Sequence, residues 1–407
     1  MSDVQAVSRR PLEGITVVDL TVNIAGPSAT LILADLGARV IKVEPPGGDV
    51  SRSWFPQDPT GTSTVFSAFN RDKESIVIDA KTSRGRELIH GLVEMADVFV
   101  ESMRPGKAAA LGLAWEDLEK INDRLIYCSV NAFGTVGPMA GVAGFDAVIQ
   151  AYSGLMDLTG HPSGDPARVG GAVIDVGSGV WAALGVVSAL MQRLQDGRGR
   201  QIETTMLGTA VGYLMHHLTS VRLAGVEPQR LGTAQHNFAP YQAIRAADQM
   251  VMIGVNSDAM WQRTAMALGV PELAEDPRYQ TNPDRSAHRD ELISDIESAT
   301  STIAASEVVD RLVAVSVPAS VVRPIGALAS DPQLDAMKLW GTTPAGVCLP
   351  RTPVADPAGS IGDIAHLGEH TVSVLAEIGI GTDDVDILIE ARTVQIDPSR
   401  AANREPA

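Results

Sequence analysis

The chain has few cysteines. Only two occur among its 407 residues, Cys128 and Cys348, and neither has metal-ligand spacing or an obvious role in a disulfide. The histidines offer no metal site either, because His216 and His217 are adjacent on a predicted helix and cannot share a face. We therefore expect a protein of the reducing cytoplasm without a bound metal.

Positive charge is also scarce. Lysine and arginine number 32 against 49 aspartates and glutamates, which gives a formal net charge of −17. A nucleic-acid-binding face needs clustered lysine and arginine against the phosphates, so this composition argues against such a partner.

Long apolar runs are missing as well. No stretch approaches the ~18 uninterrupted apolar residues of a membrane span, and residues 1–10 have no apolar signal core. We expect a soluble protein with no membrane partner, with a loose polar tail at residues 1–10 and a disordered tail after residue 397.

The chain does have 45% hydrophobic residues over a length that exceeds one ordinary core, which predicts two domains. It opens with a β-branched strand at 14–20, a helix at 27–36 and a second strand at 39–44. This βαβ unit predicts a Rossmann-like parallel sheet. No G-x-G-x-x-G follows the first strand, which argues against a nicotinamide or flavin dinucleotide as ligand.

The alternation of strands and helices continues to about residue 223 and then changes. A hairpin pattern at 240–255, with helices at 258–268 and 286–298, predicts a smaller α+β domain. The loop at 45–61 is either an exposed connection or a lid, and no residue in it is assigned a role. The expected organisation is a large domain at 1–223, a small domain at 224–326, and a return to the large domain with a C-terminal tail at 327–407.

A lone carboxylate, Asp175, is the candidate catalytic residue. It lies between an apolar run at 172–174, predicted to be a short buried strand, and a glycine-rich turn before an apolar helix at 180–194. Asp175 then sits at or just before a helix N-terminus, where amides and the helix dipole favour its anion. Its own neighbourhood leaves open whether it is catalytic or only a helix cap. Gly177 and Gly179 either offer amides to an oxyanion or are glycines of a helix entry.

Six separated motifs, taken together in their order and spacing, resemble the class III CoA-transferases, the family of formyl-CoA transferase and carnitine CoA-transferase. The resemblance covers roughly residues 11–379. The motifs are PLEGITVVD at 11–19, ADLGARVIKVE at 34–44, NRDKESI at 70–76, ESMRPG at 101–106, GFD at 144–146 and GRGRQ at 197–201.

The resemblance implies an α/β fold with a Rossmann-like large domain, a mainly parallel sheet and a smaller α+β domain, and two ring-shaped subunits interlocked as a homodimer. It also implies that Asp175 is a nucleophile. The implied activity moves CoA between an acyl-CoA thioester and a small carboxylic acid, through an aspartyl anhydride and an aspartyl-CoA thioester. CoA is then a substrate, and no cofactor is permanently bound.

CoA carries a 3′-phosphate and a pyrophosphate, so an acidic protein must place cations locally for it. Lys81, Arg104 and Lys107 are the candidates, each with the alternative of a solvated surface charge. Against the family pattern, Ser102 and Met103 replace an asparagine and a phenylalanine, and Pro45 stands where formyl-CoA transferase has an arginine. By resemblance, further CoA contacts are Ile24, Ala25, Ile78, Ser102, Met103, Asn131, Ala132, Phe133 and Gly134.

Two other functions stay open. An α-methylacyl-CoA racemase shares the family fold but needs a histidine about 30 positions before the aspartate, where this chain has Phe145, which is neither acid nor base. A non-catalytic CoA-binding protein would keep the fold with Asp175 as a cap. The acid substrate is also open, because Arg168, Arg323 and the loop near His236 are unranked candidates for selecting a carboxylate.

Overall fold

The computed structural model describes residues 10–59 and 61–398, so both predicted tails lie largely outside the described residues. The chain divides into two compact units. The first comprises Met1–Ser153, Val169–Thr219 and Gln333–Ala407, and the second comprises Gly154–Arg168 and Ser220–Pro332. The expected changes at 224 and 327 lie a few residues from these limits, and no residue pattern had pointed to the small segment before Val169.

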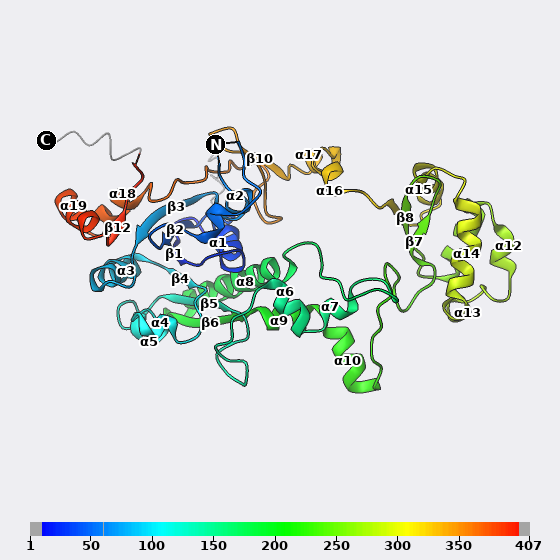
Figure 1. Cartoon of the computed structure of the whole chain (residues 1–407), viewed down its shortest axis with the longest axis horizontal. Coiled ribbons are helices and arrows are strands. Elements are labelled where there is room, and N and C mark those ends of the chain that lie inside the picture. The colour runs from blue at the N-terminus through cyan, green and yellow to red at the C-terminus, as the bar shows by residue number, and fades with distance from the viewer. Residues whose placement is uncertain (1–9, 60, 399–407) are drawn as a thin grey trace, which may run out of the picture. The chain divides into compact units, whose positions relative to one another are not determined.

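The first unit contains a seven-stranded sheet in the order β12-β3-β2-β1-β4-β5-β6 (Figure 1). Its strands are parallel except for β12, which pairs antiparallel with β3. This arrangement confirms the predicted α/β fold with a mainly parallel sheet, while β12 had no counterpart in the prediction. The strands are β1 (Thr16–Leu20), β2 (Arg39–Glu44), β3 (Lys73–Ile78), β4 (Val98–Glu101), β5 (Ile126–Asn131), β6 (Arg200–Thr205) and β12 (Val394–Gln395).

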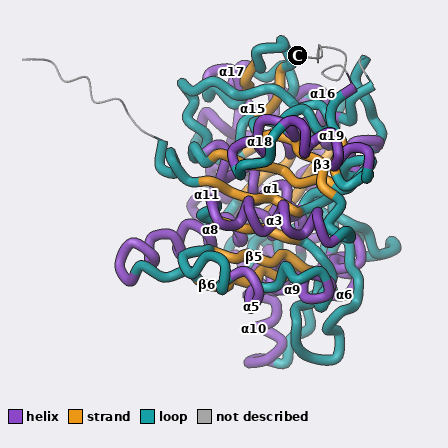
Figure 2. Tube along the Cα trace, turned by 90° about the vertical axis from the view of Figure 1, so that its left-hand side faces the viewer, coloured by secondary structure: helices purple, strands orange, loops and turns teal. Residues whose placement is uncertain are grey.

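Helices cover both faces of this sheet because its buried side chains alternate between the faces. Val17 of β1 packs with helices α1 (Ala25–Asp35) and α8 (Val173–Asp196) in one core cluster. Val18, the next residue, packs on the other side in a cluster with α3, α18 and α19, and Figure 2 shows helices flanking the strands. The bounds of these helices are α3 (Ser83–Met95), α18 (Thr371–Glu377) and α19 (Thr382–Glu390).

The sheet has a switch point between β1 and β4. The chain runs outward from β1 through β2 to β3, whereas β4, β5 and β6 extend on the other side of β1. In open α/β sheets, ligands bind in the crevice that such a reversal leaves outside the carboxyl ends of the strands. The order of the strands therefore directs attention to the loops that follow β1 and β4.

Helix α8 corrects two predictions. The run at 172–174 is not a strand, since α8 begins at Val173 and continues to Asp196. A short apolar run fits a buried strand and a buried helix equally, which explains the error. By length and composition α8 could cross a membrane, contrary to the expectation that no segment came close, and half of its most apolar window is buried inside the protein.

Short elements complete the description of the first unit. Helices α10 (Met215–Ala224) and α17 (Pro332–Ala336) cross the limits between the units. The others are η1 (Val50–Ser53), α2 (Thr64–Asn70), α4 (Lys107–Ala110), α5 (Trp115–Leu118), α6 (Asp146–Tyr152), α9 (Met206–Tyr213), β10 (Trp340–Thr342) and β11 (Cys348–Pro350).

The second unit has its own core, built on an antiparallel sheet in the order β7-β8-β9. The predicted hairpin is present as β7 and β8, and the helix predicted at 258–268 has those bounds as α11. The elements are α7 (Leu155–Leu158), β7 (Tyr241–Arg245), β8 (Met250–Gly254), α11 (Asp258–Leu268), α12 (Pro271–Glu275), α13 (Asn282–Ala287), α14 (Arg289–Thr300), α15 (Ala305–Ala314), β9 (Ala319–Val321) and α16 (Ile325–Leu328).

Candidate active site

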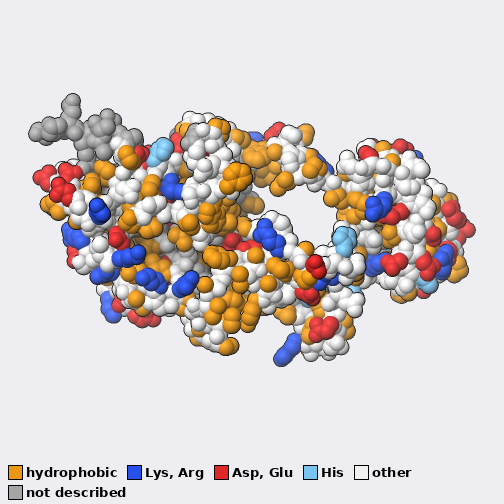
Figure 3. Space-filling view, in the orientation of Figure 1, with side chains coloured by type: hydrophobic (Ala, Val, Ile, Leu, Met, Phe, Trp, Pro, Cys, Tyr) orange, Lys and Arg blue, Asp and Glu red, His pale blue; other side chains and the backbone are white. Residues whose placement is uncertain are grey.

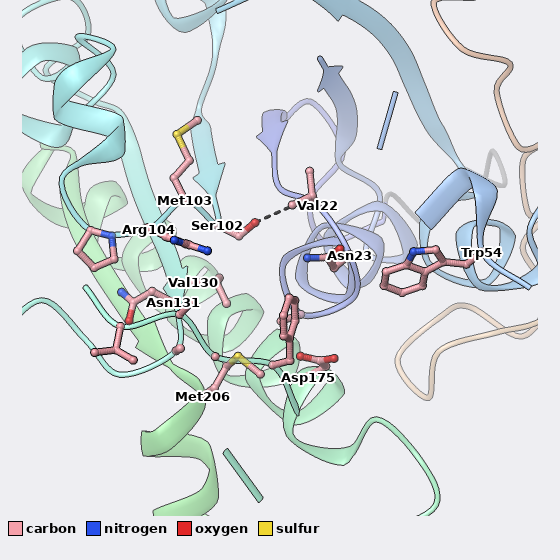
Figure 4. Close-up of a pocket in the computed structure, with 17 residues that line it drawn as sticks. Val22, Asn23, Trp54, Ser102, Met103, Arg104, Val130, Asn131, Asp175 and Met206 are labelled. Carbon is pink, nitrogen blue, oxygen red and sulfur yellow. Dashed lines mark hydrogen bonds between the residues drawn. The ribbon is translucent and has the colours of Figure 1, made fainter. Parts of the chain in front are cut away.

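A pocket of about 270 Å³ lies at the switch point of the sheet in the first unit (Figure 4). Its walls come from the loops after β1 and β4, the end of β5, the loop before α6, and the starts of α8 and α9. The lining residues are Val22, Asn23, Ala25, Trp54, Ser102, Met103, Arg104, Pro105, Val130, Asn131, Ala132, Val142, Ala143, Gly144, Phe145, Asp175 and Met206.

Asp175 is the carboxylate of this pocket. It is the third residue of α8, and its side chain forms no ion pair or hydrogen bond with any residue that the structure describes. Burial and, to a smaller extent, the nearby negative charge of Asp146 together raise the pKa of Asp175 from 3.8 to about 7. The carboxyl group therefore changes its charge near neutral pH rather than in the usual acidic range.

Asp146 fixes the start of α8. Its Oδ2 accepts hydrogen bonds from the backbone N–H groups of Ile174 at 2.8 Å and of Asp175 at 3.2 Å. Its Oδ1 accepts from Nε2 of the fully buried Gln150, whose Oε1 accepts from the backbone N–H of Val169. Because Ala172 at the N-cap position supplies no side-chain acceptor, a residue 28 positions before Ile174 satisfies the first amides of the helix.

Gly177 and Gly179 do not offer free amides. Hydrogen bonding within α8 already begins at the N–H of Val176, so both glycines lie inside the helix. A Cβ at Gly177 would lie 1.9 Å from Oη of Tyr213, and one at Gly179 would lie 2.4 Å from Cβ of Ser28. These glycines permit close helix packing, and the oxyanion role considered for their amides is wrong.

The loop after β1 is held by side chains at three successive backbone amides. The N–H of Thr21 donates to Asp19 at 2.8 Å, that of Val22 to Oγ of Ser102 at 3.1 Å, and that of Asn23 to Oδ1 of Asp49 at 3.3 Å. Figure 4 draws the bond between Ser102 and Val22 as a dashed line. Ser102, one of the departures from the family pattern, therefore anchors the opposite wall of the pocket.

Buried ion pairs also hold the loop after β1 in place. Lys42 on β2 pairs with Asp49 at 3.0 Å and donates to the carbonyl oxygen of Thr21 at 2.9 Å. Lys73 on β3 pairs with Asp19 at 3.2 Å. Because an unpaired buried charge is costly, these pairs hold both acids, and through them the loop, in one geometry.

A second cavity of about 240 Å³ shares Val22, Ser102 and Met103 with the first. Neither Lys81 nor Lys107 forms an ion pair with a described residue, so both cations in its lining are available to a ligand. The rest of its lining is largely apolar. The cavity is bordered by Leu20, Val22, Val43, Pro45, Ile78, Asp79, Ala80, Lys81, Ser102, Met103, Lys107 and Leu111.

The structure brings together most of the predicted CoA contacts, nine of which line one or both cavities. Ile24, Phe133 and Gly134 line neither cavity. Ile24 precedes α1, the ring of Phe133 packs edge-on against Tyr152, and the N–H of Gly134 donates to Asn131 at 2.6 Å. In the first pocket lie Ala25, Ser102, Met103, Arg104, Asn131 and Ala132, and in the second lie Ile78, Lys81, Ser102, Met103 and Lys107.

Several residues of the site were missed from sequence. Trp54 lines the pocket, and Asp49 anchors it, although both lie in the loop to which no role was assigned. Asn23 lies in the loop just after the first strand, a position typical of ligand contacts in such sheets, and that signal could have found it. Asp146 stood within a family motif, but no local pattern reveals its bonds to α8.

The pocket contains no histidine among its lining residues. Phe145, at the position where the racemases need a histidine, lines it with 66% of its surface exposed, so no acid–base group stands there. Within residues 10–59 and 61–398, no three His, Cys, Asp or Glu side chains come together in a group that could hold a metal ion.

The family description "CoA-transferase family III" matches residues 12–358, and the chain belongs to this family. The predicted family is thereby confirmed. A mouse succinyl-CoA:glutarate CoA-transferase is 41% identical over 70% of this chain and 66% of its own length, so the chain spans just under two thirds of that relative. A succinate–glutarate CoA-transferase of Agrobacterium fabrum is 36% identical over 90% of this chain and 96% of its own.

Other relatives agree. An acetyl-CoA:oxalate CoA-transferase of Acetobacter aceti is 38% identical over 86% of this chain and 90% of that protein. The crystal structure of a CAIB/BAIF family protein from Brucella suis has a TM-score of 0.83 at 36% identity, over 91% of this chain and all of that one. A family III CoA-transferase is therefore the enzyme class to which the fold and pocket belong.

Proposed function

We propose that the chain moves CoA from an acyl-CoA to a small dicarboxylic acid, with Asp175 as the nucleophile. One observation carries the proposal: an unpaired carboxyl group lines the pocket at the switch point of the sheet, where ligands of such folds bind. The hydrogen bond that the backbone N–H of Asp175 donates to Asp146 holds that residue in place.

The proposed reaction uses CoA as a substrate and involves no separate cofactor. A carboxylate oxygen of Asp175 attacks the thioester carbonyl carbon, the C–S bond breaks, and CoA leaves as a thiolate, so that a mixed anhydride between Asp175 and the donor acid remains. The thiolate then attacks the carbonyl carbon of the Asp175 side chain, and the donor acid leaves as its carboxylate. The acceptor carboxylate attacks the carbonyl carbon of the resulting aspartyl-CoA thioester, which releases the thiolate and forms a second mixed anhydride. The thiolate then attacks the acceptor's carbonyl carbon, which gives the new acyl-CoA and restores the Asp175 carboxylate.

The raised pKa of Asp175 suits this role. At a pKa of about 7, a substantial fraction of the carboxyl group is ionised at neutral pH. The environment that raises the pKa withholds water from the anion, and a poorly solvated carboxylate is a stronger base toward a carbonyl carbon. A carboxylate that served only as a helix cap would instead be stabilised as an anion.

CoA itself fits the two adjoining cavities. The thiol end would lie with Asp175, and the nucleotide end in the second cavity, where Lys81 and Lys107 face it. Arg104 lines the first cavity and follows Ser102 and Met103, which line both, so we assign it to the phosphates of CoA. Cations at the carboxyl ends of strands are the natural partners of phosphate in an acidic protein.

The dicarboxylic acid is inferred from the relatives, whose names include glutarate, succinate and oxalate as substrates. Each of these substrates is a short acid with two carboxylates. We take a four- or five-carbon dicarboxylate as the working substrate, since two of these relatives are named for succinate or succinyl-CoA and glutarate, and one of them matches 90% of this chain and 96% of its own length.

The test compares two aspartates at the same helical position. Asp384 is the third residue of α19, as Asp175 is of α8, but it is exposed. With succinyl-CoA and glutarate, we expect Asp175→Ala to abolish transfer and Asp384→Ala to leave it unchanged. Succinyl-CoA alone, followed by hydroxylamine, should convert Asp175 to a hydroxamate visible by peptide mass spectrometry. Near-normal turnover of Asp175→Ala, or a label on another residue, would rule out this nucleophile.

We also propose that the protein is a homodimer. Helix α8 buries one face in its own core, yet its other face exposes an apolar stripe along much of its length, and a second copy of the chain is the partner that the family resemblance implies. Figure 3 shows hydrophobic side chains gathered over the region of α6, α8 and α9. The stripe consists of Val176, Val180, Trp181, Leu184, Met191 and Leu194.

Sedimentation velocity tests the dimer. We expect the parent protein to sediment as a dimer and Leu184→Glu, which places a charge on the stripe, to shift it toward the monomer. A parent that is monomeric at micromolar concentration would refute the proposal.

The cytoplasmic location remains a prediction from composition, which fractionation of the native source would test.

A further inference from the structure

The backbone of Asn23 has an unusual conformation and is held in place by hydrogen bonds. Its backbone adopts the left-handed conformation, with φ of 67°, which asparagine tolerates better than most residues. The amides of Thr21, Val22 and Asn23 are each held by a side chain, and Asp49, which holds the last, is itself paired with buried Lys42. The side chain of Asn23 is thus presented to the pocket from a fixed backbone.

The polar side chains of the pocket differ in whether they already have hydrogen-bond partners. Asn131 donates to Glu203 at 2.8 Å and accepts from Gly134, so both ends of its amide are engaged. The hydroxyl of Ser102 accepts from Val22. The side-chain amide of Asn23, in contrast, makes no hydrogen bond with any residue that the structure describes. Figure 4 shows it beside Val22, in the same pocket as Asp175.

We propose that Asn23 determines specificity for acids that carry a second polar group, by donating a hydrogen bond from its side-chain amide to the distal carboxylate of a dicarboxylic acid. The proposal rests on the function proposed above and extends it. One carboxylate of the acid reacts at Asp175, and the other must find a donor elsewhere in the pocket.

The apolar character of much of the remaining lining favours such a donor. Much of the lining is apolar, including Val130, Val142 and Met206, and a carboxylate placed against such side chains would lose its hydration without compensation. A neutral amide supplies N–H donors without an opposing charge of its own. Because its backbone is already fixed, Asn23 loses little freedom when it binds.

The experiment compares glutarate with valerate, which has the same five-carbon chain but only one carboxylate. Succinyl-CoA is the donor, and kcat/KM is measured for each acid. Asn23→Gly keeps the left-handed backbone and removes the amide, whereas Asn23→Asp keeps the size and replaces the donor by an anion. We expect the preference for glutarate over valerate to fall by about tenfold to a hundredfold in Asn23→Gly, and further in Asn23→Asp.

Several results would overturn the assignment. An equal loss for both acids would mean that Asn23 shapes the loop or binds CoA, and a collapse of the preference in Arg104→Ala but not in Asn23→Gly would transfer the role to Arg104. A parent enzyme without preference for glutarate would also refute it. Hydroxylamine trapping on Asp175 separates the two proposals: if trapping persists in Asn23→Gly and the preference is unchanged, only the role of Asn23 fails.

Discussion

The charge of Asp146 should set the pH at which the enzyme becomes active, and Asp146→Asn tests this directly. The substitution removes the negative charge beside Asp175 and keeps one carbonyl oxygen. That oxygen can still accept from the amides of Ile174 and Asp175, provided that the carboxamide of Gln150 turns to face the new NH₂ group. Val169 would then lose its acceptor, so we expect a stability loss of about 1–2 kcal/mol.

The size of the pH effect follows from the raised pKa. The pKa of Asp175 rises from 3.8 to about 7, with burial as the larger cause and Asp146 as the smaller. Asp146 therefore accounts for less than half of a shift of about three units, at most about 1.5 units or roughly 2 kcal/mol. Because Asp175 must be ionised to attack, activity rises with pH through its pKa. Without the charge of Asp146, this rise should move to lower pH.

The assay is the pH dependence of kcat/KM for succinyl-CoA, which reports ionisations of the free enzyme. We expect a midpoint near pH 7 in the parent, lowered by about 0.5–1.5 units in Asp146→Asn. Glu94→Gln, an exposed change of equal charge on α3 outside the pocket, is the control and should leave the midpoint in place. An unmoved or raised midpoint in Asp146→Asn would refute the coupling between the two aspartates.

Three further outcomes are expected. Arg104→Ala should weaken CoA binding about tenfold to a hundredfold in calorimetry but hardly affect a pantetheine thioester, which lacks the phosphates; equal losses would make Arg104 structural. The enzyme should not exchange the α-proton of a 2-methylacyl-CoA in deuterated water, because Phe145 supplies no base, and exchange at an enzymatic rate would favour a racemase. The stability of Asp175→Asn relative to the parent should be about 1–2 kcal/mol greater at pH 8.5 than at pH 5, since the parent's carboxyl, with its raised pKa, loses native stability as pH rises through 7; a difference between variant and parent that is the same at both pH values would contradict the raised pKa.

Much of the fold could be predicted because its signals are local. The β-branched strand β2 and the helix α11 were predicted with the bounds they have. These elements carry their period and their caps within a few neighbouring residues. The order of the strands was not predicted, and only the structure shows that residues after β1 and β4 line the pocket.

The errors around Asp175 have a non-local cause. The amides at the start of α8 are satisfied by Asp146 and not by a residue of their own segment, so no capping signal stood near Val173. The same holds for the loop after β1, whose amides are bound by Asp49 and Ser102 from elsewhere in the chain. Contacts between residues far apart in the chain produce no periodic pattern in the sequence from which they could be predicted.

This dependence on distant partners explains how a family motif can change without loss of the pocket. Ser102 stands where the family pattern has an asparagine, yet its hydroxyl still reaches the amide of Val22. In this chain the position supplies a short polar acceptor for the loop after β1. Met103 next to it lines both cavities, so an unbranched, adaptable side chain takes the place of a ring. The departures thus alter the surface offered to CoA while the backbone around Asn23 and Asp175 keeps its anchors.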